Sequence, residues 1–266
     1  MNPSTFRHHS LGLKSILIVA NNEWRAFTTN KGVLVSMLMQ PVMMYGLLVL
    51  ALSTNISSVK YAGHVIPYNQ YALIGILAFF MTTQMSQAMY RATVDKQYGL
   101  LAIKFLNGVQ PWQYLCGMSL FPSLGFIFQS IILFILGILS SGIYNVVYYF
   151  IALVFALIIL EFWSSLGILI STKISSYQKR DLIITLVFIP VSYAAPTLYV
   201  LPHHAPLLLK MLTSINPLTY QLNAIRSIAY GNFNITSIGI GVLITIVMIV
   251  ATQIILNRMQ LTLSER

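Results

Sequence analysis

The sequence predicts an all-α integral membrane protein, a single transmembrane domain over residues 1–266 with six membrane-spanning helices. Hydrophobic residues make up 57% of the chain and charged residues only 8%, whereas about a quarter of an ordinary soluble domain is charged. Mean hydropathy is correspondingly high, at +0.79. Apolar runs such as IILFILGIL (131–139) do not alternate with polar residues as barrel strands do. Because backbone groups in lipid must be satisfied internally, such runs are predicted to be helices.

Six windows are long enough to cross the membrane, since about 20 apolar residues span a hydrocarbon core of roughly 30 Å. They lie at 33–53, 71–90, 113–139, 145–171, 182–201 and 236–256. An earlier apolar stretch, 11–20, is interrupted by Lys14 and lacks a small-residue cleavage site, so it is not interpreted as a signal peptide.

Residues 10–30 are predicted to form an amphipathic helix that lies in the membrane interface. Apolar side chains recur there at helical spacing: Leu13, Ile16, Leu17, Ala20, Trp24 and Phe27. Lys14 and Arg25 lie on other sides of the helix. A solvated leader, the alternative, would not need such a stripe, and Trp24 suits the headgroup level.

Residues 91–111, between the second and third windows, are too charged to cross a bilayer and too apolar for a solvated loop. Leu101 and Phe105, four residues apart, would share one helix face, and Gly108 and Pro111 would end the helix. A short cytoplasmic amphipathic helix is therefore predicted. It could receive force from a soluble partner or lie on lipid, and the residues alone leave both open.

Residues 203–229, between the last two windows, are predicted to form short apolar helices that dip into the outer leaflet. Pro206 and Pro217 divide the segment into pieces too short to span a membrane. Irregular backbone at membrane depth needs a cover of protein. Asn216–Pro217 favours a turn, after which Pro217 can start a helix.

The basic residues predict that both termini are cytoplasmic, by the positive-inside rule. With that orientation, three basic residues lie outside: Lys60, Lys210 and Arg226. Twelve lie inside: Arg7, Lys14, Arg25, Lys31, Arg91, Lys96, Lys104, Lys173, Lys179, Arg180, Arg258 and Arg266. The net charge of +10 is then explained by a basic rim facing anionic lipids, and no nucleic-acid partner is predicted.

The chain carries few groups suited to catalysis or metal binding. It contains no HExxH and no Walker A sequence GxxxxGK[ST], so no catalytic residue, metal site or cofactor is predicted in this chain. His203 and His204 are adjacent residues that do not share a helix face and have no carboxylate near them, His8–His9 is interpreted as a solvated terminal pair, and Cys116 is the only cysteine. An ATP-driven activity would have to use a separate ATPase.

Glu161 is the one acidic residue inside a predicted span, where a carboxylate costs roughly 2.5–3.5 kcal/mol. It could face a substrate path or hydrogen-bond to Ser164, Ser165 or a neighbouring span. Methionines enrich the first two spans, and methionine is common on promiscuous binding surfaces. Met37, Met44 and Met85 are therefore candidate path residues with Glu161, and ordinary packing is the alternative.

Four motifs in order resemble the permease subunit of bacterial type-2 ATP-binding-cassette exporters. They are EWRAF (23–27), Gln40–Pro41, DKQYGLL (95–101) and NPLTYQLNAIRSIAYG (216–231). The resemblance runs from about residue 10 to residue 258, and the last motif is the most specific. Gln97 departs from the family, which usually has an acidic residue at that position.

The resemblance implies a permease of the bacterial plasma membrane that pairs with a second permease copy. Each copy would dock on a cytoplasmic ATPase, which would hold ATP and Mg²⁺. The implied coupling residues are Asp95, Lys96, Tyr98, Gly99, Leu101, Lys104 and Phe105, with Leu101 and Phe105 filling a pocket of the ATPase. The implied outer re-entrant element includes Asn216, Pro217, Tyr220 and Arg226.

The expected substrate is an amphipathic drug, peptide or lipid-like molecule. The resemblance also covers polysaccharide and teichoic-acid exporters, which are the main alternative. A membrane-embedded enzyme or assembly factor and a secondary carrier are alternatives from other functional classes.

Overall fold

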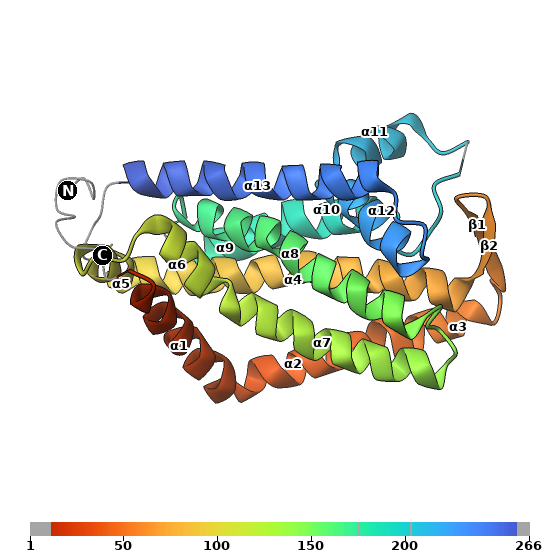
Figure 1. Cartoon of the computed structure of the whole chain (residues 1–266), viewed down its shortest axis with the longest axis horizontal. Helices are drawn as coiled ribbons and strands as arrows, with labels where there is room; N and C mark the ends of the chain where they lie inside the picture. The colour runs from red at the N-terminus through yellow and green to blue at the C-terminus, as the bar shows by residue number, and fades with distance from the viewer. Residues whose placement is uncertain (1–11, 175, 203, 260–266) are drawn as a thin grey trace.

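Helices run along the length of the molecule and are joined at its two ends, as the computed structural model shows (Figure 1). The structure describes residues 12–174, 176–202 and 204–259, so His8, His9 and His203 lie outside the described residues. Five helical stretches of the described chain are long and apolar enough to cross a membrane: Lys31–Ser53, Tyr68–Gln97, Pro111–Leu139, Val146–Ser171 and Ile235–Arg258. This composition of apolar helices makes the chain a multi-pass membrane protein.

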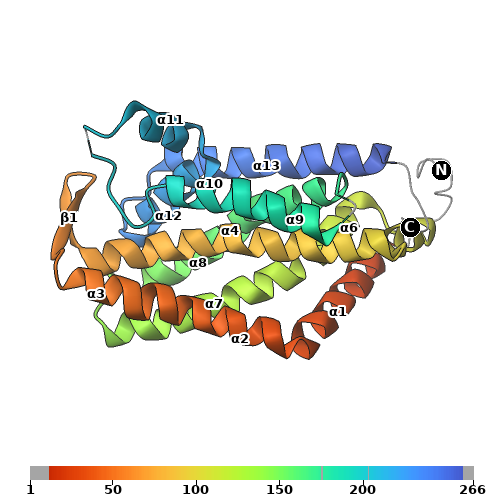
Figure 2. The ribbon, with the colours of Figure 1, turned by 180° about the vertical axis from the view of Figure 1, so that it is seen from behind.

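These stretches contain seven helices and one π-helical segment: α2 (Lys31–Pro41), η2 (Val42–Val49), α3 (Leu50–Ser53), α4 (Tyr68–Gln97), α6 (Pro111–Met118), α7 (Leu120–Leu139), α8 (Val146–Ser171) and α13 (Ile235–Arg258). Helix α4 lies at the centre of the bundle (Figures 1 and 2). In its most apolar window 83% of the residues are buried, against 17% in α13. The core therefore forms around α4, and the other stretches expose apolar sides suited to lipid.

The segment predicted as the fifth span differs from the expectation of 182–201. It forms α9 (Tyr177–Ile183), η3 (Ile184–Phe188) and α10 (Ile189–Ala194), and the helix then ends. Ala195 is extended because it precedes Pro196, and a residue before proline avoids the helical region. The helical part starts earlier and is about 27 Å long at 1.5 Å per residue, with Lys179, Arg180 and Asp181 near its start. This segment is therefore not one of the five helical stretches that are long and apolar enough to cross a membrane.

Helix α1 (Lys14–Thr29) meets α2 at an elbow (Figure 2), where the Asn30 side chain accepts a hydrogen bond from the Val33 amide at 3.3 Å. Leu13, Leu17 and Trp24 of the predicted stripe are exposed. Phe27 instead packs edge-on against Phe121, with ring centroids 5.3 Å apart. The helix thus packs on the bundle through one side and leaves an apolar stripe free to meet lipid.

The far end of the molecule carries a β-hairpin that the sequence analysis did not predict. Strands β1 (Ser58–Tyr61) and β2 (His64–Pro67) pair antiparallel with Ser58 opposite Pro67. Ala62 and Gly63 both have positive φ, as a two-residue hairpin turn of this kind requires. The segment predicted as the outer element forms α11 (Leu207–Ile215) and α12 (Pro217–Ala229) beside it.

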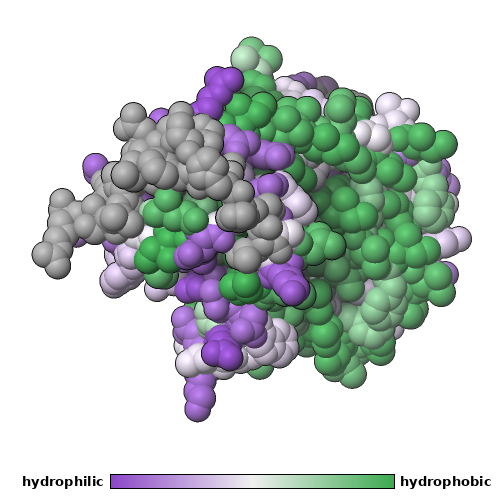
Figure 3. Space-filling model, turned by 60° about the vertical axis from the view of Figure 1, so that its left-hand side comes forward, coloured by the Kyte–Doolittle hydropathy of each residue, from purple (hydrophilic) through white to green (hydrophobic). Residues whose placement is uncertain are grey.

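Hydrophilic residues gather at the opposite end, where α1, α4, α5 (Leu100–Leu106) and α6 meet, while apolar residues cover the sides (Figure 3). This distribution is what a bilayer around the sides of the bundle requires.

Candidate functional site

Helix α5 sits at a junction of four helices at the hydrophilic end. It is separated from α4 by Tyr98 and Gly99, and Gly99 has φ +70°, a left-handed conformation that glycine adopts without strain. The chain then turns again at Gly108, with φ +87°, before α6 begins at Pro111. These two turns hold α5 across the ends of the long helices.

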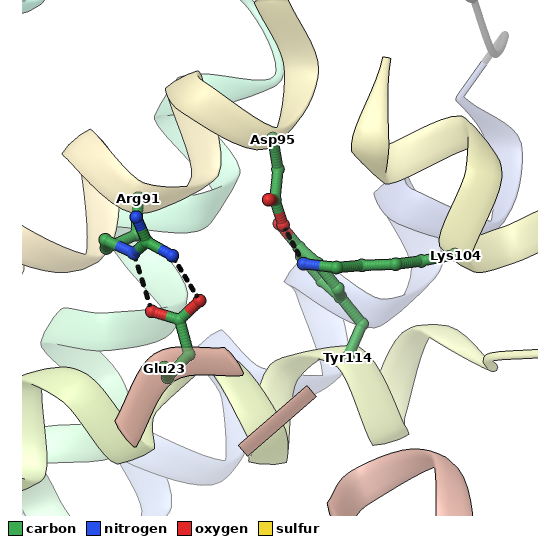
Figure 4. Close-up of polar contacts among 5 residues, drawn as sticks. All are labelled: Glu23, Arg91, Asp95, Lys104 and Tyr114. Atoms are coloured by element: carbon green, nitrogen blue, oxygen red, sulfur yellow. Dashed lines mark hydrogen bonds and ion pairs between the residues drawn. The ribbon is translucent and has the colours of Figure 1, made fainter. Parts of the chain in front are cut away.

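An ion pair joins α1 to α4 at this junction (Figure 4). Arg91 donates from Nε and Nη2 to the two carboxylate oxygens of Glu23, at 2.8 and 2.9 Å. Burial raises the pKa of the fully buried Glu23 carboxyl above its ordinary value, while the hydrogen bond and charge of Arg91 act in the opposite direction. Two-pronged pairing of this kind fixes the angle between helices as well as their distance.

A second polar contact joins α4, α5 and α6 (Figure 4). Asp95 of α4 pairs with Lys104 of α5 and accepts a hydrogen bond from the Tyr114 hydroxyl of α6 at 3.0 Å. The Lys104 ammonium also lies 5.3 Å from the centre of the Tyr114 ring, within cation–π range. Since Asp95 is 2% exposed, its two partners are what compensate its charge.

Further hydrogen bonds tie the junction to α8 and α1. Lys96 donates to the carbonyl of Thr172 at 3.0 Å and to that of Ile174 at 3.2 Å, just after α8 ends. Ser15 of α1 donates to Gln113 of α6 at 2.7 Å. A displacement of α5 would therefore be passed to α4 and α6 directly, to α8 through Lys96 of α4, and to α1 through α4 and α6.

The structure buries the face of α5 that was expected to meet the ATPase. Leu101 and Phe105 are 5% and 1% exposed and belong to a buried cluster with Val19 and Tyr114. They cannot fill a partner's pocket in this conformation, because the chain's own helices already cover them. The exposed apolar face of α5 is instead formed by Leu100, Ile103 and Leu106, and Tyr98 beside it is the most exposed, at 69%.

The candidate path residues do not line an open cavity. Met37 and Met85 are buried, and Met44 is partly buried against the main core. Glu161 of α8 accepts a hydrogen bond from Ser119, between α6 and α7, at 2.6 Å. The alternative of a hydrogen bond to a neighbouring span is therefore the arrangement observed for Glu161.

A chain of three glutamines joins α2, α4 and α7, and the sequence analysis did not single it out. Gln84 donates to Gln129 at 2.8 Å, and Gln129 donates to Gln40 at 2.7 Å. Gln84 and Gln129 are buried. Amide side chains inside three predicted spans were a usable signal, because polar groups in hydrocarbon need one another as partners. The sequence analysis did not predict the Glu23–Arg91 pair either, although the chain has only five acidic residues in all.

Helix α12 is held by backbone carbonyl groups of α10 and of the segment that follows it. Arg226 of α12 is fully buried, donates to the carbonyls of Pro196 and Thr197 at 2.9 Å each, and stacks 3.7 Å from the centre of the Tyr71 ring. Asn216 donates to the Val191 carbonyl at 2.6 Å and caps α12, which begins at Pro217.

Tyr220, in contrast, is 38% exposed and donates to the Ser214 carbonyl at 2.7 Å. Asn216 and Arg226 thus anchor α12, whereas Tyr220 joins it to α11.

A pocket of about 620 Å³ opens between the hairpin and the end of α12. Its lining combines aromatic and amide side chains with one arginine: Tyr61, Tyr144, Tyr230, Asn223, Asn232 and Arg226. The Tyr61 hydroxyl donates to Asn223 at 3.3 Å across it.

Comparison with known proteins gives one family. The model of the ABC-2 type transporter matches residues 14–230, from the start of α1 to the end of α12. A search of curated proteins finds no match. The match covers both the α4–α5–α6 junction and the outer element, and the chain belongs to the ABC-2 type transporter family as a membrane component.

Proposed function

We propose that the chain is the permease subunit of an ATP-driven exporter in the bacterial plasma membrane. In this proposal both termini and α5 are cytoplasmic, α9 to α10 forms the fifth of six crossings, and α1 lies in the interface. A separate ATPase binds ATP and Mg²⁺, this chain holds no cofactor, and a second permease copy completes the transporter.

The observation that carries the proposal is the exposed apolar row of α5. Leu100, Ile103 and Leu106 are 40–47% exposed at the hydrophilic end, where the bilayer does not cover the bundle. An exposed apolar patch rimmed by polar residues is typical of an interaction site. The row lies on a helix that is hydrogen-bonded and ion-paired to its neighbours, so a partner that moves α5 moves the bundle.

Force applied to α5 has a defined route in this arrangement. Asp95 and Lys104 pass it to α4, Lys96 passes it to the end of α8, and α1 carries it to α2. Both α2 and α9 continue into π-helical segments, η2 after Pro41 and η3 before Pro190. Helices bend most readily at proline and at π-helical turns, which suits these two passes to open and close a path.

An amphipathic drug, peptide or lipid-like substrate is proposed for this path, because most of the interior is apolar. The outer pocket supports a second candidate. Its three tyrosines and three asparagines offer the stacking surfaces and hydrogen-bonding groups that a glycan would use, which favours export of a polysaccharide or teichoic acid. Transport into inverted vesicles with a drug panel and a lipid-linked glycan distinguishes the two.

The test of the ATPase partnership is Ile103→Asp, with the chain coexpressed with an ATPase subunit encoded beside it. We expect the variant to fold normally and to lose at least about tenfold of the copurifying ATPase, because a charge enters the apolar contact. Gln178→Asp is the matched control, since it adds the same charge at an exposed position of α9, outside the row. Normal copurification and transport in Ile103→Asp, or transport that persists without ATP, would refute the proposal.

A further inference from the structure

A groove of about 530 Å³ lies between the end of α8, the start of α9 and the end of α13. Its walls are apolar and include Ile170, Leu182, Ile183 and Ile255. The two charged side chains in its lining are Lys173 and Lys179, and both are exposed. No residue of α5 lines the groove, although Thr172 and Ile174 in its lining accept the hydrogen bonds of Lys96 described above, and the groove shares no residue with the pocket beside the hairpin.

The charges of the two lysines have no compensation within the described chain. Asp181, the acidic residue on α9, accepts a hydrogen bond from Arg180 Nε at 2.8 Å and forms its ion pair with that residue. Neither Lys173 nor Lys179 forms an ion pair with the described residues. The groove therefore combines an apolar recess with two ammonium groups that are available to an external anion.

Water does not suit this recess, because ordered water needs polar partners and apolar cavities stay dry. The volume is in the range of about 300–1,000 Å³ that is usual for small-molecule sites. A second copy of the chain in a symmetric contact would present the same patch, and so would bring two more lysines toward these two. The chemistry on both sides of the groove instead fits a molecule with an apolar chain and an anionic head.

We propose that the groove binds an anionic phospholipid, with one acyl chain between α9 and α13 and the phosphate between Lys173 and Lys179. Basic pockets between transmembrane helices are a recognised setting for anionic headgroups. The acyl chain would pack between α9 and α13 and so stabilise the position of the charged start of α9. This site does not depend on the ATPase and would persist if the proposed function were wrong.

The test uses the full-length chain in mild detergent, with binding of phosphatidylglycerol and phosphatidylcholine measured by native mass spectrometry. Wild type should prefer phosphatidylglycerol. In Lys173→Gln/Lys179→Gln we expect its affinity to fall about fivefold for each lysine removed, the contribution of one basic side chain near an anionic lipid surface. The control, Lys14→Gln/Lys31→Gln, removes two exposed lysines elsewhere in the chain and should retain the preference.

A second variant, Ile183→Trp, occupies the recess while keeping both lysines, and should reduce binding of phosphatidylglycerol without changing the melting temperature. An unchanged preference in the double lysine variant would overturn the proposal. Displacement of phosphatidylglycerol by glycerol 3-phosphate, which has no acyl chain, would also overturn it, because the apolar recess would then contribute nothing.

Discussion

Glu23, Asp95, Glu161 and Asp181 are the acidic residues of the described chain, and each has a polar partner from a basic or hydroxyl side chain. Burying a carboxylate without such a partner is costly, because the charged form loses its hydration. Three of the four join different helices, and Asp181 alone pairs with its neighbour in sequence. At the scale of single residues, charge in this protein fixes how helices meet.

The Glu23–Arg91 pair allows this to be tested. In Arg91→Met, the fully buried Glu23 loses its partner, and we expect a destabilisation of about 3 kcal/mol. Glu23→Met/Arg91→Met removes both charges and should recover much of that loss. Thermal unfolding in detergent measures both. Asp181→Asn serves as the control, because the Asp181 side chain is 62% exposed and surface pairs contribute at most about 1 kcal/mol. Equal losses in the single and double variants would contradict the argument.

At the scale of elements, the sequence predicted most helices because apolar length is a direct property of composition. It did not predict where the fifth span ends, since the break depends on how Pro196 and its neighbours are held. Their carbonyls accept hydrogen bonds from Arg226 and from Tyr71, which come from distant parts of the chain. Gly75 permits this packing, because a Cβ there would lie 1.7 Å from the Thr197 carbonyl oxygen.

The sequence also did not predict which face of helix α5 is buried. Leu101 and Phe105 are correctly placed on one face by their spacing, but Leu100, Ile103 and Leu106 form an equally apolar face. Periodicity alone does not say which face packs on the chain. That choice is made by Tyr114 and Val19, which come from α6 and α1.

The two faces of α5 therefore predict different phenotypes. Phe105→Ala should destabilise the chain by about 3–5 kcal/mol, the usual range for truncating a buried phenylalanine, and lower its melting temperature in detergent. Ile103→Ala, on the exposed face, should change stability by no more than about 0.5 kcal/mol. If Phe105→Ala melted like wild type and lost only the ATPase, Phe105 would be a partner contact and its buried position would be wrong.

At the scale of the whole molecule, the arrangement has two chemically different ends and apolar sides. The charged junction of α1, α4, α5 and α6 lies at one end, and the hairpin lies at the other (Figure 1). The pocket of about 620 Å³ is beside the hairpin. The glutamine chain crosses the bundle between them and joins α2 to α4 through α7. The sequence could predict which residues belong to each end, because basic residues are concentrated in alternate loops.

The proposed orientation predicts which end an impermeant thiol reagent can reach in intact cells. In a Cys116→Ser background, cysteines at Ser57 and Asn232 should react from outside, because both positions are exposed and lie near the hairpin. Cysteines at Asn107 and Gln178, also exposed, should react only after the membrane is opened. All four positions are surface sites, where substitution changes stability little.

The pair Gln178 and Asn232 tests the crossing formed by α9 to α10 directly, because that helical segment has three charged residues near its start. Labelling of both from the same side would show that this stretch does not cross, and a full reversal would overturn the orientation inferred from the basic residues.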